Sequence, residues 1–164
     1  MRATFPNKPI AILLRMLDEA YDHRAWHGTN LRGSLRGLNA RQAAWRPAPR
    51  RHNIWEEAVH TAYWKYAVWR RLTGEKRGSF ALEGSNWFAR PADPATEAAW
   101  RADMALLERA HRRLRAAVEQ LSAVELGRRA RGVKTTPFDL ILGVACHDVY
   151  HAGQIQLLKR LQKS

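Results

Sequence analysis

The chain has 164 residues, 46% of them hydrophobic, which suits one folded domain over residues 1–164 and argues against a disordered chain. Its single cysteine, Cys146, excludes an intrachain disulfide, and no apolar stretch approaches the length of a membrane span, so we expect a soluble, cytoplasmic protein. The 28 basic and 15 acidic residues leave a net charge of +13. The arginines are scattered from Arg2 to Arg160, which argues against nucleic-acid binding as the main role and leaves attraction of an anionic substrate as a milder use.

Apolar residues recur with a helical period in four segments, which run over residues 9–31, 53–72, 93–121 and 136–161. Gly28 marks a kink or an early end of the first segment. Asn53 begins a capping-box-like sequence, Asp93 precedes a proline at the first helical position, and Thr136 opens the clearest helix start. Strand patterns are nearly absent, so the sequence predicts an all-α four-helix bundle.

Two connections are longer than the usual turns of helix bundles. Residues 33–52 and residues 74–92 each extend for about 20 residues, whereas such turns usually take two to eight. We therefore expect them to form lids or walls of a site. Trp87 lies in the second connection, where it either covers a pocket or seals one end of the core.

The seven histidines include two pairs with i,i+4 spacing, His23 with His27 and His147 with His151. On a helix this spacing places both imidazoles on one face, about 5–6 Å apart at Cβ, so two ring nitrogens can converge on one ion. Apolar residues lie at both ends of the stripe that carries His147 and His151, which directs this pair toward the bundle interior. A third ligand from a neighbouring helix would complete a facial triad with open positions.

His60 lies in the second helical segment, close to two carboxylates. Glu56 is expected to serve as the capping-box acid, which leaves Glu57 to support a ligand or act as a base, or to be a solvated carboxylate among the arginines. His27 is expected to line the pocket. The remaining histidines are expected at the surface: His23, His52 and His111.

Two residues beside His147 in the fourth helical segment have roles that need to be weighed. Cys146 points about 100° around the helix from His147, so we expect a small buried thiol and not a ligand. Asp148 either orders an imidazole or pairs with a surface arginine, and the sequence does not choose between the two.

Three stretches resemble the DinB/YfiT-like superfamily of four-helix-bundle metalloproteins. They are the segment Leu38-Asn-Ala-Arg-Gln-Ala-Ala-Trp-Arg-Pro47, the helix start Asn53-Ile-Trp-Glu-Glu-Ala-Val-His60, and the more specific His147-Asp-Val-Tyr-His151-Ala-Gly-Gln-Ile155. The resemblance extends from about residue 10 to residue 161, although the first and third helical segments match only in length and character.

The resemblance implies that His60, His147 and His151 bind a divalent metal ion, with zinc the first expectation and nickel or another divalent metal as alternatives. It also implies an up-up-down-down bundle with long crossover loops, and commonly a homodimer. Characterised relatives include transferases and isomerases that use low-molecular-weight thiols. A small-molecule substrate, for example such a thiol, is therefore the expected partner.

Three neutral imidazoles leave the ion its full Lewis acidity, which favours a metal-dependent thiol transferase or hydrolase. A non-catalytic, stress-related protein with a structural or incidental metal is the alternative. In that case a fourth protein ligand is expected, and His27 or Glu57 is available for it. A basic nucleic-acid-binding protein is a weaker third hypothesis.

Overall fold

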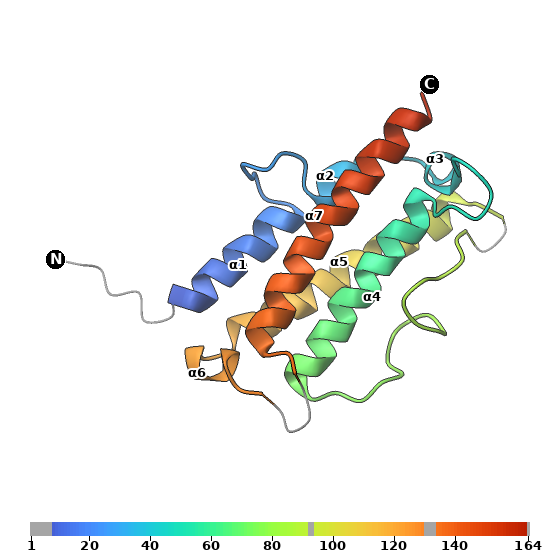
Figure 1. Ribbon diagram of the computed structural model, residues 1–164. Helices are drawn as coiled ribbons and strands as arrows, with labels where there is room; N and C mark the ends of the chain where they lie inside the picture. The colour runs from blue at the N-terminus through green and yellow to red at the C-terminus, as the bar shows by residue number, and fades with distance from the viewer. Residues whose placement is uncertain (1–7, 92–93, 130–133, 164) are drawn as a thin grey trace.

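The computed structural model describes residues 8–91, 94–129 and 134–163, and within these ranges it contains seven helices and no β-strand. The four long ones are α1 (Lys8–Tyr21), α4 (Ile54–Thr73), α5 (Glu97–Glu119) and α7 (Pro137–Leu161). The three short ones are α2 (Leu31–Leu35), α3 (Ala40–Ala44) and α6 (Ala123–Leu126). The all-α prediction is confirmed (Figure 1), and none of these helices is long and apolar enough to cross a membrane.

The direction of each long helix follows from the ends that share a hydrophobic core. One buried cluster joins the ends of α1 and α7 to the starts of α4 and α5, and it includes Trp55 and Leu158. A second cluster joins the opposite ends of the same four helices, and it includes Val68 and Ile141. Helices α1 and α7 therefore run in one direction and α4 and α5 in the other, as the colours in Figure 1 show.

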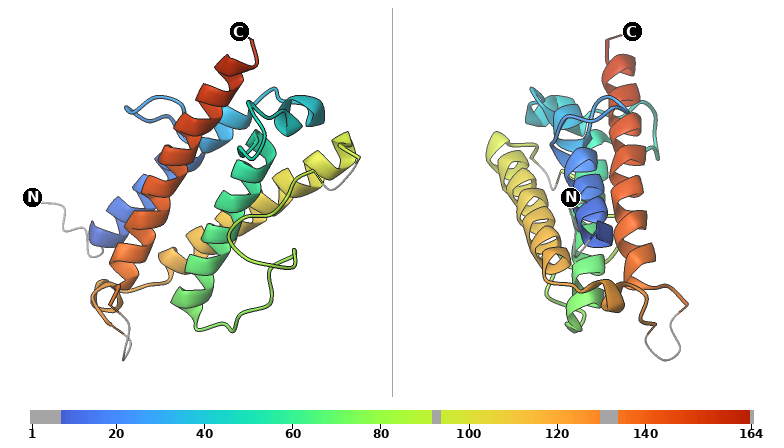
Figure 2. Two further views of the ribbon diagram at one scale, coloured as in Figure 1. Left: turned by 45° about the vertical axis from the view of Figure 1, so that its right-hand side comes forward. Right: turned by 90° about the vertical axis from the view of Figure 1, so that its left-hand side faces the viewer.

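This up-down-down-up order differs from the expected up-up-down-down order, and one connection instead of several crosses the length of the bundle. The connection between the parallel helices α4 and α5, described over residues 74–91 and 94–96, makes that crossing. Residues 22–53 join the antiparallel helices α1 and α4 at one end, where they fold into α2 and α3 (Figure 2). The length of this connection is used to cover the end of the bundle, because α2 packs on α7 and α3 packs on α4 and α5.

Two of the predicted helix starts are confirmed by reciprocal hydrogen bonds. The Asn53 side chain accepts from the backbone N–H of Glu56, and the Glu56 carboxylate accepts from the backbone N–H of Asn53. Thr136 and Asp139 form the same capping box at the start of α7, with Pro137 as its first residue. Each box satisfies backbone donors that the first turn leaves without a helical partner.

Two boundaries differ from the prediction, and in each case a side-chain cap begins the next helix at another residue. Helix α1 ends at Tyr21 and not near Leu31, and Asn30 caps a new helix by accepting from the backbone N–H of Gly33. Helix α5 begins after Thr96, whose side chain serves as its N-cap. The predicted start at Asp93 lies outside the described residues.

The long connection after α4 packs along that helix (Figures 1 and 2). The hydroxyl of Tyr66 accepts from the backbone N–H of Ser79, and Phe80 and Phe88 contact the ring of Tyr63. Aromatic contacts of this kind hold an irregular segment in place. The segment thereby forms a wall beside the middle of α4, where His60 lies.

Candidate metal centre

Three histidines from two helices meet in the interior of the bundle. His147 and His151 lie one turn apart on α7, and His60 projects toward them from α4. The Nε2 atom of His147 lies 3.1 Å from that of His60 and 3.0 Å from that of His151. The ligand atoms of all three residues lie within 4.8 Å of one another. The structure thus brings together the three residues predicted as metal ligands.

Hydrogen bonds on the far side of two rings determine where their protons lie. The Nδ1 atom of His60 lies 2.9 Å from the backbone oxygen of Asn86, which can only accept. The Nδ1 atom of His151 contacts the carboxylate of Glu57, which also accepts. In the neutral state both rings therefore hold their proton on Nδ1 and present a lone pair on Nε2.

Converging lone pairs suit a cation. His147 carries one proton when neutral, so it can donate to at most one of its two Nε2 neighbours, and the other contact stays repulsive without an ion between the rings. Nitrogen ligands held about 2.0–2.1 Å from one ion lie roughly 3 Å apart. The observed separations of 3.0 and 3.1 Å fit that requirement.

Burial keeps these rings neutral. Loss of hydration lowers the pKa of His60 to about 4, partly offset by the hydrogen bond to Asn86. Loss of hydration also lowers the pKa of His147 to about 3, with a further contribution from the neighbouring His151. Metal binding requires deprotonated imidazoles. Near neutral pH these two rings are in the form that binds a metal.

The chain matches the family model of the DinB superfamily over residues 21–155. The chain belongs to the DinB superfamily. The matched range contains all three histidines and extends from the end of α1 nearly to the end of α7. No curated protein and no solved structure gave a significant match.

In this DinB-superfamily chain the described residues bring no fourth metal-binding side chain into the histidine cluster. Glu57 is buried and contacts Nδ1 of His151, so it is not the solvated carboxylate that was one of its predicted alternatives. His27 is exposed in the turn after α1 and is not part of the histidine cluster. Among the described residues the cluster therefore offers three nitrogen donors.

Trp87, predicted to cover a pocket, stacks directly on a candidate ligand. Its ring lies parallel to that of His60, with ring centres 3.8 Å apart, and its other face stacks on His52 at 3.6 Å. His52 was expected at the surface without a role, and no local pattern indicates this stack. It forms because the loop after α4 folds back onto the start of that helix, and it restrains the His60 ring.

Asn86 is a second residue that the sequence did not single out. Its backbone oxygen accepts from His60, and its side-chain oxygen accepts from Nε1 of Trp64 at 3.0 Å. The residue adopts a left-handed backbone conformation with φ of 66°, which asparagine tolerates better than most residues. The sequence Gly84-Ser-Asn86 in the long connection is the only local hint of this turn.

A buried ion pair lies behind the histidines. Asp148 contacts Nζ of Lys65, and both side chains are fully buried. Asp148 was predicted to order an imidazole or to pair with a surface arginine, and the structure instead pairs it with Lys65. Burial raises the pKa of Asp148, while the neighbouring ammonium opposes that rise. Cys146 is exposed on α7, so the expectation of a buried thiol is wrong as well.

Proposed function

We propose that this chain is a metal-dependent enzyme that acts on a small molecule at the three-histidine site. One observation carries the proposal: three Nε2 atoms converge and the described residues supply no fourth ligand. A structural zinc site normally closes its coordination shell with protein atoms, whereas a catalytic site keeps a position for water or substrate. The donor set therefore favours catalysis over a purely structural role.

Imidazole ligands suit zinc, and nickel or another divalent ion is compatible with the same donors. When bound, such an ion supplies Lewis acidity and lowers the pKa of a water or thiol ligand. The side chains around the site perform positioning roles. Glu57 keeps the His151 proton on Nδ1, and the carbonyl of Asn86 does the same for His60. These roles support a thiol-dependent transferase or a hydrolase.

The test begins with metal analysis of protein purified without a histidine tag. The proposal predicts close to one divalent ion per chain, and loss of that ion in His147→Ala. The loaded protein is then screened with low-molecular-weight thiols and electrophilic or hydrolysable substrates. Stoichiometric metal together with an activity that His147→Ala leaves intact would refute the enzyme proposal. Stoichiometric metal without any reaction across the screen would favour the alternative of a non-catalytic metal-binding protein.

We also propose that the chain forms a homodimer through the outer face of α7. Cys146 and Tyr150 lie four residues apart and Leu157 follows two helical turns later, so the three share one face of α7. All three are exposed, Tyr150 by 63% and Leu157 by 56%. An apolar stripe of this kind on a helix whose opposite face is already buried is typical of an interface. Sedimentation analysis should show a dimer that Leu157→Glu converts to a monomer, and a monomeric wild-type protein would contradict the proposal.

A further inference from the structure

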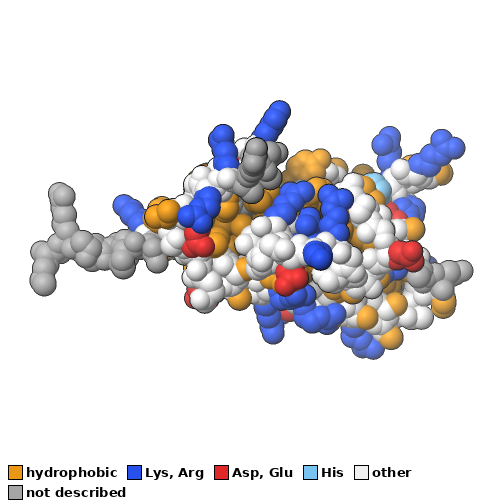
Figure 3. All heavy atoms as spheres, turned by 90° about the horizontal axis from the view of Figure 1, so that it is seen from below, with side chains coloured by type: hydrophobic (Ala, Val, Ile, Leu, Met, Phe, Trp, Pro, Cys, Tyr) orange, Lys and Arg blue, Asp and Glu red, His pale blue; other side chains and the backbone are white. Residues whose placement is uncertain are grey.

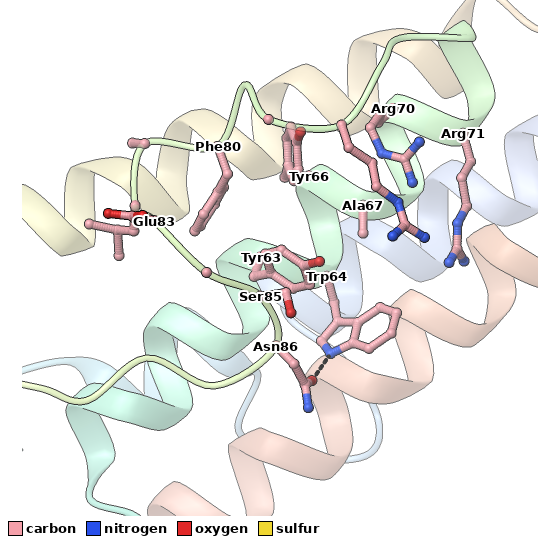
Figure 4. Close-up of a pocket in the computed structure, with 15 residues that line it drawn as sticks. Tyr63, Trp64, Tyr66, Ala67, Arg70, Arg71, Phe80, Glu83, Ser85 and Asn86 are labelled. Carbon is pink, nitrogen blue, oxygen red and sulfur yellow. Dashed lines mark hydrogen bonds between the residues drawn. The ribbon is translucent and has the colours of Figure 1, made fainter.

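A large cavity adjoins the histidine site on the side of the long connection. It measures about 650 Å³ and lies between the second half of α4 and the segment around Phe80 and Asn86 (Figure 4). Trp64 lines this cavity and meets His60 and His147 edge-on, with ring centres 6.4 and 6.2 Å apart. One wall of the cavity is therefore also a wall of the metal centre.

A smaller hollow lies between α4 and α7 and shares two lining residues with the large cavity. It measures about 170 Å³ and is lined by Trp64, Arg71 and His147. Trp64 and Arg71 also line the large cavity. A ligand of ordinary metabolite size can therefore contact Arg71 in the cavity and approach His147 with its other end.

Three arginines line the large cavity, and the one acidic residue among its lining residues is Glu83. Arg70 and Arg71 extend from the last turns of α4 toward the space beside Trp64 (Figure 4), and Arg77 follows in the connection. Within the described part of the chain none of the three forms an ion pair, although Arg70 donates to the backbone oxygen of Glu75.

Of the cavity arginines Arg70 is half-buried, whereas Arg71 and Arg77 are exposed. Three other arginines of the chain are paired with carboxylates. Arg46 binds Glu56, Arg90 binds Asp103, and Arg115 binds Asp18. The arginines of the cavity also line an adjoining hollow with Arg128 and Arg129, where the arginines outnumber the two acidic lining residues, Glu75 and Glu125. Figure 3, which looks onto this end of the bundle, shows many Lys and Arg side chains and few acidic ones. Such unpaired guanidinium groups favour a bound anion.

The remaining walls of the cavity are largely aromatic. Tyr63, Tyr66 and Phe80 line it together with Trp64. Aromatic faces accept an apolar or aromatic body, while guanidinium groups bind carboxylate or phosphate oxygens in pairs. The same cavity thus offers both halves of a site for an organic anion.

We propose that Arg70, Arg71 and Arg77 bind the anionic group of an organic substrate whose apolar body lies on the aromatic wall. The reactive end of that substrate then faces the histidine site past Trp64. This inference rests on the proposed enzyme function for the role of the histidines, but the anion site itself depends only on the cavity. The substrate class is a carboxylate or phosphate ester with an aromatic or apolar body.

The test measures binding by calorimetry with three probes of similar size: 3-phenylpropionate, phenyl phosphate and the neutral 3-phenylpropionamide. The wild-type protein should bind at least one anion clearly more tightly than the amide, and the two anions show which group the arginines prefer. Arg70→Gln/Arg71→Gln should weaken anion binding about tenfold or more, since it removes two charge-assisted contacts. The control Arg24→Gln/Arg101→Gln, which removes the same charge from two exposed arginines elsewhere, should bind as the wild type does.

Equal affinity for the amide and the acid, or unchanged anion binding by Arg70→Gln/Arg71→Gln, would overturn the anion site. Binding of a DNA duplex in place of every small probe would also overturn it and would support a nucleic-acid surface. The same titrations on His147→Ala separate the two proposals, because the anion site should persist when the metal site is broken. Anion binding without metal or activity in the wild type would refute the enzyme function alone.

Discussion

Replacing Glu57 by glutamine tests whether its carboxylate supports the metal centre through His151. The carboxylate is 5% exposed and contacts Nδ1 of His151, whose Nε2 belongs to the converging set. Glutamine keeps the size and one acceptor oxygen but removes the negative charge. The imidazole then becomes a weaker donor to the metal, while the fold around it keeps its packing.

The size of the effect follows from the burial of this contact. Losing a hydrogen-bonded partner behind a metal ligand typically weakens metal affinity about 10- to 100-fold, or about 1.4–2.8 kcal/mol. Because a bound metal stabilises only the folded chain, the same loss appears in thermal unfolding. For a domain of this size each kcal/mol corresponds to about 2–4 °C, so the rise in Tm on adding zinc should shrink by roughly 3–10 °C.

Competition between the protein and a chelating zinc indicator measures the affinity, and thermal unfolding with and without zinc measures the stabilisation. Glu83→Gln is the matched control, because it removes the same charge from a carboxylate outside the histidine cluster. Wild-type zinc affinity in Glu57→Gln would refute the reasoning, and so would an equal loss in both variants, which would indicate a general charge effect.

Three further predictions concern the surroundings of the site. Burial, with Lys65 and Arg115 nearby, lowers the pKa of His111 to about 2, so its contribution to stability is present above the unfolded pKa near 6.5 and is lost as pH falls. Between pH 7 and pH 5 the free energy of unfolding, measured with urea, should fall by about 2 kcal/mol more in the wild type than in His111→Phe. An equal fall in both proteins would contradict this prediction. Trp87→Ala removes the stack on a ligand ring and should speed zinc release to a chelator about two- to tenfold, so an unchanged rate would argue against restraint by the stack. Lys65→Met leaves Asp148 buried without its partner and should cost about 3–5 kcal/mol in urea unfolding, part of which Asp148→Asn in the same chain restores; a single variant as stable as the double one would show that the pair is not coupled.

The local sequence was sufficient for the starts of α4 and α7 and for the spacing of the histidine pair on α7. A capping box depends on residues three positions apart, so Asn53 and Thr136 are recognisable without any tertiary information. The i,i+4 spacing of His147 and His151 likewise places both rings on one face of any helix. Where a local cap interrupts a long apolar pattern, as Asn30 does, the periodicity overestimates the helix length.

The direction of each helix depended on how the preceding connection folds and not on how many residues that connection has. Residues 22–53 are numerous enough to cross the bundle, but they fold into α2 and α3. Helix α4 therefore starts at the end of the bundle where α1 ends. No local pattern distinguishes a long connection that crosses from one that covers an end. The two core clusters make the distinction, because they show which helix ends are buried together.

The sequence by itself therefore determined the all-α class, the starts of α4 and α7 and the inward histidine pair, since each depends on residues close together along one helix. Only the tertiary structure decided the surroundings of that pair. The stack of Trp87 on His60, the carbonyl of Asn86 and the pairing of Lys65 with Asp148 join residues from different elements. No helical or strand repeat relates the positions of these residues in the sequence, so only the packing of the bundle brings them together.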